Sequence, residues 1–183
     1  MKNLTLTLSS LILVGAALVG CMATSNAASA QEDKAPNDLE IAHIAYTAGN
    51  IDIRYAHLAL ALSDDPKVRE FAELMVRDHT AVNNKALALA SRLHITPQDN
   101  ATSQQLSQRA KEIRNELSNL RGAAFDKRYA ANELEYHKFV NGAVENGLIP
   151  STTNAELKAL LTSALQTFKV HEGHAASMNQ RLM

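Results

Sequence analysis

The feature that most constrains this chain is a helical pattern of apolar residues, which is clearest over residues 68–93. Positions that alternate four and three apart are apolar at every place but one. They are Val68, Ala72, Met75, His79, Val82, Ala86, Leu89 and Leu93. Steps of four and three mark the face that a helix buries in a bundle. His79 is therefore expected to point inward, where a polar group is costly unless something satisfies it.

Three further segments have the same apolar face, and each face is interrupted near its middle. The interrupting residues are Asp52 in residues 41–62, Glu133 and His137 in residues 122–147, and His171 in residues 157–182. A single inward polar residue would be unremarkable in a helix bundle. Because all four faces have one, these residues are expected to form a cluster.

The spacing of the segments predicts the fold class. Helices one and two are separated only by the stretch Ser-Asp-Asp-Pro, and helices three and four by a short turn, so each pair is expected to form an antiparallel hairpin. Residues 98–121, with a weaker helical pattern, join the pairs. The prediction is an all-α, ferritin-like, up-down four-helix bundle with a long helical crossover between helices two and three. An aromatic share of 4% disfavours a β-sandwich.

Helix-capping signals predict where three of these helices begin. The pairs are Asn37 with Glu40, Asp65 with Pro66, and Thr153 with Glu156. The second helix is expected to end near His94, and the third near Gly147.

The rise of ~1.5 Å per residue predicts the depth of the polar residues in the bundle. Measured from the turn between helices one and two, Asp52 and His79 lie at nearly one level. Glu133, His137 and His171 match more loosely. Imidazoles and carboxylates that converge inside a bundle are typical ligands of a metal ion. The candidate ligands are Asp52, Asp78, His79, Glu133, His137 and His171, with Asp78 expected to orient or supplement His79.

The metal would be a transition ion, namely Zn, Cu, Mn or Fe. The alternative is a buried hydrogen-bonded network that holds no metal. A carboxylate-bridged di-iron site is disfavoured, because Glu-x-x-His is missing before His79 and His171. The one such match, Glu40 with His43, lies at a helix start and is expected to be solvated. His57, His94 and His174 fall off the buried faces, although His174 could join His171.

The N-terminal residues are predicted to be a targeting segment. Residues 1–20 have a basic residue and an apolar stretch too short to span a membrane, which is typical of a signal peptide. They end in Leu-Val-Gly before Cys21, the only cysteine, which resembles a bacterial lipobox and predicts lipidation there. Simple cleavage after Ala30 is the alternative. Residues 21–36 are expected to be a tether, and residues 37–183 the four-helix domain.

These signals predict an outer-membrane lipoprotein that faces the periplasm and contacts the membrane through its lipid anchor. Met22, in place of Asp, favours the outer membrane. A soluble periplasmic or secreted protein is the alternative. The formal net charge of −1 gives no basic footprint, so no nucleic-acid partner is expected. No nucleophile motif, phosphate loop or acid–base pair indicates a hydrolase or transferase, so enzymatic activity is not predicted.

Three stretches resemble a known family: FAELMVRDH at residues 71–79, LRGAAFDKRYAANELEYH at residues 120–137, and FKVH at residues 168–171. They resemble the ferritin-like domain-of-unknown-function family 4142, whose members are often described as predicted outer-membrane proteins. The resemblance implies a secreted ferritin-like bundle and brings no settled activity. The family usually has Glu where this chain has Asp52, and the shorter carboxylate could weaken or re-aim a ligand.

Two functional hypotheses follow from the sequence. In the first, the chain is a cell-envelope protein with a buried metal site, with redox chemistry as one use of that metal. In the second, it is a non-catalytic envelope lipoprotein whose surface engages partners, and the polar cluster only fixes the register of the helices.

Overall fold

The computed structural model describes residues 35–183, and all regular structure in that range is helical, which confirms the predicted all-α class. The elements are α1 (Asp38–Leu62), α2 (Pro66–Arg92), α3 (Ala101–Ser118), α4 (Gly122–Ala143), the π-helix η1 (Val144–Leu148), α5 (Ile149–Ser151) and α6 (Ala155–Leu182). None of these helices is long and apolar enough to cross a membrane. The predicted signal peptide, Cys21 and most of the tether lie outside the described residues.

The first two capping predictions are confirmed. The side chain of Asn37 accepts hydrogen bonds from the first turn of α1, and Glu40 accepts one from the Asn37 backbone N–H at 2.9 Å. Asp65 accepts from the backbone N–H groups of Lys67 and Val68 at the start of α2. These caps satisfy N–H groups that have no partner within the helix.

The third capping prediction is wrong by one residue. Asn154, not Thr153, caps α6 and accepts from the Glu156 and Leu157 backbone N–H groups at 3.0 and 2.9 Å. Thr153 is engaged elsewhere, because its backbone N–H and its hydroxyl both donate to Asp38 of α1. The contact ties the start of α6 to the start of α1.

The third long helix also runs further than expected. Instead of ending near Gly147, the chain stays helical through η1 and α5 as far as Ser151. The Ile149 backbone N–H donates to the Val144 carbonyl, which is the wider turn of a π-helix.

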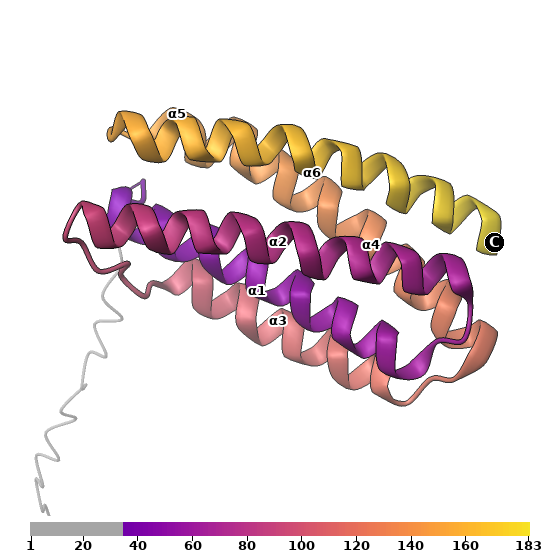
Figure 1. The fold of residues 1–183 in the computed structure, drawn as a ribbon. Coiled ribbons are helices and arrows are strands. Elements are labelled where there is room, and N and C mark those ends of the chain that lie inside the picture. Colours follow the sequence, from indigo (N-terminus) through magenta and orange to yellow (C-terminus); the bar gives the residue numbers. More distant parts are fainter. Residues whose placement is uncertain (1–34) are drawn as a thin grey trace, which may run out of the picture. The chain divides into compact units, whose positions relative to one another are not determined.

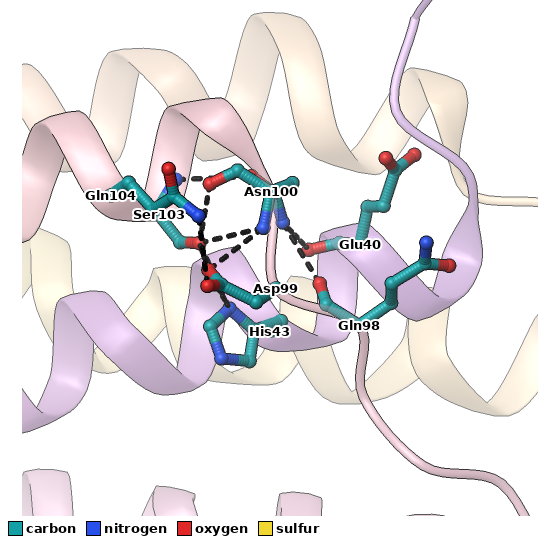
Figure 2. A network of polar contacts seen from close by, with 7 residues as sticks. All are labelled: Glu40, His43, Gln98, Asp99, Asn100, Ser103 and Gln104. Atoms are coloured by element: carbon teal, nitrogen blue, oxygen red, sulfur yellow. Dashed lines mark hydrogen bonds and ion pairs between the residues drawn. The ribbon is translucent and has the colours of Figure 1, made fainter.

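The helices pack as two hairpins with α3 alongside. α1 and α2 run side by side, α4 and α6 form the second pair, and α2 packs on α6. α3 joins the two pairs in sequence and lies along α1, as Figure 1 shows. Two hydrogen bonds fasten its N-terminal end to α1. The Gln98 backbone N–H donates to the Leu39 carbonyl. The Asn100 amide donates to the Glu40 carbonyl, as Figure 2 shows.

The core divides into two apolar clusters. One lies toward the α1–α2 turn and includes Tyr55, Phe71, Phe125 and Tyr129. The other lies toward the opposite end, where α1 begins. Its buried members are Ile41, Ile44, Val144, Leu148, Leu157, Leu161 and Leu165. Between the two along the helices lies a level of buried polar side chains, called the polar level below and made of Asp52, His79, Glu133, His137 and His171.

Candidate metal centre

α1 and α2 bring Asp52 and His79 into contact across the first hairpin. Asp52 is fully buried and His79 is 3% exposed. Asp52 Oδ2 lies 3.0 Å from His79 Nε2. The two residues share a level because each is a similar number of helical turns from the tight α1–α2 connection, as the depth count predicts. The His79 ring also stacks on Phe168 of α6, with ring centroids 4.4 Å apart and an interplanar angle of 4°.

α4 contributes Glu133 and His137 one turn apart, so that both side chains lie on its buried face. His137 Nδ1 lies 2.9 Å from the Glu133 backbone carbonyl oxygen. Because that oxygen can only accept, Nδ1 carries the proton and Nε2 of a neutral ring carries a lone pair. His137 Nε2 lies 3.3 Å from Asp52 Oδ2, so two acceptors face each other.

α6 places the His171 ring beside the other two histidines. Its centroid is 5.4 Å from that of His79 and 5.7 Å from that of His137. His171 Nε2 lies 3.0 Å from Asp78 Oδ2, and this nitrogen is the donor because an ionised carboxylate only accepts. Nδ1 of His171 is then left with a free lone pair.

Asp78 differs from its expected role. It was expected to act on His79, its neighbour in sequence, but it contacts His171. Consecutive residues of a helix point in different directions, and Asp78 projects from α2 toward α6. Its other oxygen accepts from the Arg77 side chain at 2.7 Å. Asp78 thus orients the His171 ring from outside the cluster.

Most polar atoms of the polar level have no hydrogen-bond partner in the described part of the chain. The unpartnered atoms are both carboxylate oxygens of Asp52 and of Glu133, both ring nitrogens of His79, Nε2 of His137 and Nδ1 of His171. The approach of Asp52 to His79 is close, but it is off the line of the N–H bond and is not a hydrogen bond. A buried polar network normally satisfies such atoms.

The protonation states leave the cluster rich in lone pairs. Burial raises the pKa of the Asp52 carboxyl, but the adjacent histidines lower it by more, so Asp52 is ionised at neutral pH. Burial and the neighbouring charge of Asp52 raise the pKa of Glu133 well above its ordinary value. Burial also lowers the pKa of His137, and lowers that of His171 to about 4. Both imidazoles are therefore neutral and able to ligate.

The donor atoms form two overlapping groups. One holds His79, His137 and His171, and the other holds Asp52, Glu133 and His137. Within each group the potential ligand atoms all lie within 4.8 Å of one another. His137 belongs to both groups, so the five residues make one continuous cluster.

The remaining histidines lie elsewhere. His57, His94 and His174 are exposed, so His174 does not join His171. His43 differs from expectation, because it is part-buried and not solvated. Its Nδ1 lies 2.9 Å from Ser103 Oγ, at the start of α3 (Figure 2).

The His43 cluster has the residue types of a nucleophilic site but not the geometry. Ser103 Oγ lies 2.8 Å from Asp99 Oδ1, and the same nitrogen of His43 faces both residues. A proton relay needs the serine and the aspartate on opposite nitrogens of the ring. Ser103 is also only 1% exposed. The cluster therefore holds α3 on α1.

The described residues include three buried asparagines near the polar level, Asn83, Asn132 and Asn141, which the apolar pattern did not indicate. Asn83 follows His79 by four residues, and Asn141 follows His137 by four. The Asn141 amide donates to the Phe168 carbonyl at 3.2 Å and to Glu172 at 2.8 Å, which ties α4 to α6. The shared one-turn spacing on the same helix face was the available signal.

Comparison with known proteins bears on the fold and the family. No curated protein matches this sequence. A similar solved structure is CopM in the Cu(II)-bound form, with a TM-score of 0.61 and 14% sequence identity. The match covers 80% of this chain and 98% of that chain, and at this identity the likeness concerns the fold. The family model named Domain of unknown function (DUF4142) matches residues 23–178, and the chain belongs to that family.

Proposed function

We propose that this protein binds a first-row transition-metal ion in the polar level, through the imidazoles of His79, His137 and His171 and the carboxylates of Asp52 and Glu133. The observation that carries the proposal is the contact between His137 Nε2 and Asp52 Oδ2. Two lone-pair atoms 3.3 Å apart in a dry interior repel each other, unless a cation lies within reach of both.

The metal-free network is the weaker explanation of this contact. It would need a proton on His137 Nε2, and burial lowers the pKa of that ring and so disfavours the imidazolium. It would also need hydrogen bonds from His79 to its neighbours, and within residues 35–183 neither ring nitrogen of His79 makes one. A metal ion could accept the lone pairs of His137 Nε2 and of one His79 ring nitrogen at once.

The donor set favours particular ions. Three imidazoles with one or two carboxylates suit Cu(II), Zn(II) or Fe(II), and the general affinity order places Cu(II) highest. CopM, similar in fold, is described in a Cu(II)-bound form, and we place Cu(II) first on the donor chemistry. A di-iron site of the ferritin type is disfavoured, since α2 and α6 have Val76 and Phe168 where it needs Glu.

Residues around the cluster hold the ligands in place. Asp78 accepts the Nε2 proton of His171, and the Glu133 carbonyl accepts the Nδ1 proton of His137. A second partner of this kind fixes which nitrogen ligates and makes that nitrogen more basic. Stacking on Phe168 sets the plane of the His79 ring.

The setting of this site is part of the proposal. The Leu-Val-Gly-Cys21 sequence supports an envelope lipoprotein anchored in the outer membrane. The two hairpins with α3 between them in sequence support a ferritin-like arrangement. Neither carries the metal assignment.

Equilibrium dialysis tests the proposal. The metal-free protein is dialysed against Cu(II), Zn(II), Mn(II) or Fe(II), and bound metal is counted by elemental analysis. We expect stoichiometric binding by the wild type, and its loss in His137→Ala. His174→Ala removes an exposed histidine from α6 and should bind as the wild type does. Equal binding by the two variants would place the metal on the surface and overturn the proposal.

A further inference from the structure

A cavity of about 430 Å³ lies on the side of the polar level where α1 begins. α1, α2, α4 and α6 all line it, mostly with apolar side chains such as Leu89, Val140 and Leu161. Its inner end reaches Asp52 and His79. Leu89 and Val140 are only part-buried, so the cavity opens to solvent.

The cavity persists because small side chains line it and because its end is tied. The small side chains are those of Ala45, Ala86 and Ala164, and larger residues at these positions would fill the space. The hydrogen bonds that Asp38 accepts from the Thr153 and Asn154 backbone N–H groups fasten α1 to α6 at this end. Protein cores rarely leave so large an apolar space empty, and water gains little from an apolar wall. The volume lies in the range of small-molecule sites.

The charges around the cavity restrict what can enter it. Among residues 35–183, the charged residues that line it are Asp38 and Asp52, and none of the lining residues is Lys or Arg. An anionic head group would find no counter-charge there and would lie near carboxylates. A neutral ligand meets no such cost.

A glycine of α1 lets α2 approach closely beside the cavity. Asn83 of α2 and Gly49 of α1 both line it. Asn83 Oδ1 lies so close to Gly49 that a Cβ added there would be only 2.5 Å from it. This close approach explains a glycine inside α1, where glycine is otherwise unfavourable.

We infer that this cavity binds a neutral, predominantly apolar small molecule. The inference goes beyond the proposed metal site and does not depend on it. Binding is expected both in the metal-free and in the metal-loaded protein.

The first experiment uses two fluorescent probes that share one aromatic body. N-phenyl-1-naphthylamine is neutral, and 1-anilinonaphthalene-8-sulfonate is its anionic counterpart. In the metal-free protein, the neutral probe should bind at one site, and the anionic probe about tenfold more weakly or worse, because its sulfonate finds no cation in the cavity. Equal affinities, or binding of many probe molecules per chain, would overturn the inference.

Variants of α2 locate the probe. Ala86→Phe fills the cavity and should abolish binding of the neutral probe. Ala88→Phe puts the same ring on the exposed face of α2, two residues away, and should leave binding unchanged. Circular dichroism and melting temperature check that both variants fold. Loss of binding in both variants, or in neither, would contradict the assignment to this cavity.

Discussion

On one side of the polar level the helices pack without a large gap, whereas on the other side they leave a cavity of about 430 Å³. The packed half contains Phe71, Phe125 and Tyr129, whose rings stack or meet edge to face. In the open half, α2 has the same periodicity of apolar residues, but Val82 and Leu89 are part-exposed. Periodicity alone therefore does not decide how well a helix face is filled.

The size of the residues that face each other decides how each half packs. Before the polar level, α2 meets aromatic side chains from α4, and Met75 is fully buried. Beyond it, the same face of α2 meets alanines such as Ala45 and Ala164 across the cavity. The polar level separates a half built for stability from a half that leaves room.

The largest expected difference between the halves is in leucine truncation. Leu117→Ala removes a fully buried side chain from the packed half and should lower the free energy of unfolding by ~2–5 kcal/mol. Leu89→Ala removes a side chain that already borders the cavity, so the loss should stay below ~1.5 kcal/mol. Urea unfolding measures both. Equal losses would mean that the cavity is closed in solution.

Metal binding should stabilise the level between the halves. At a hundredfold excess over its dissociation constant, the metal should raise the free energy of unfolding by ~2.7 kcal/mol, because it binds only the folded state. His79→Ala should abolish this gain. His57→Ala, on the exposed face of α1, should retain it. Thermal melts with and without Cu, Zn, Mn and Fe make the comparison, and no shift of the wild-type melt would leave the polar level as a structural network.

Enlarging an alanine should have opposite effects in the two halves. Ala72→Leu adds volume to a fully buried position of α2 and should destabilise the fold by ~1–3 kcal/mol. Ala86→Leu, on the same helix, adds volume to the cavity and should stabilise it by ~0.5–2 kcal/mol. Unfolding in urea measures both changes in the free energy of unfolding. If both variants are destabilised, the open half cannot accept added volume.

The smallest expected effect is the release of one proton when the metal binds. Burial and the charge of Asp52 raise the pKa of Glu133, and Glu133 must lose its proton to ligate a metal. Below this raised pKa, metal affinity should therefore fall about tenfold for each unit that the pH drops. Because the pKa of His171 is lowered to about 4, protons compete with the metal for its imidazole only in more acidic solution.

Calorimetry in buffers of different ionisation enthalpy counts the proton that is released at neutral pH. Glu133→Gln should release about one proton fewer than the wild type. The same release by the two proteins would show that Glu133 does not ligate the metal.

The sequence predicts much of this arrangement for a clear physical reason. Helical periodicity fixes the direction of each side chain, and a rise of ~1.5 Å per residue fixes its depth, so Asp52 and His79 can be placed on one level beforehand. Periodicity does not fix which neighbour a side chain bonds. Asp78 is an example, because its partner His171 lies on another helix, 93 residues away in sequence.

Competition between two possible capping residues explains the difference at the start of α6. Thr153 and Asn154 can both cap a helix, and the choice depends on Asp38, which binds the backbone N–H groups of both. His43 was expected in solvent because it lies near the start of a helix and off its buried face. The weak helical pattern of α3 does not show that α3 covers this position. The cavity was also not foreseen, since its volume depends on how far apart the helix axes lie.

The most direct test of the metal assignment is anomalous diffraction from crystals of the metal-loaded protein. We predict a peak inside the polar level, within ~2.0–2.3 Å of His137 Nε2 and His171 Nδ1. In each of these rings the other nitrogen already makes a hydrogen bond to the protein. A structure of the fully loaded protein with its peaks only at exposed histidines such as His57 or His94, and none among the buried rings, would contradict it.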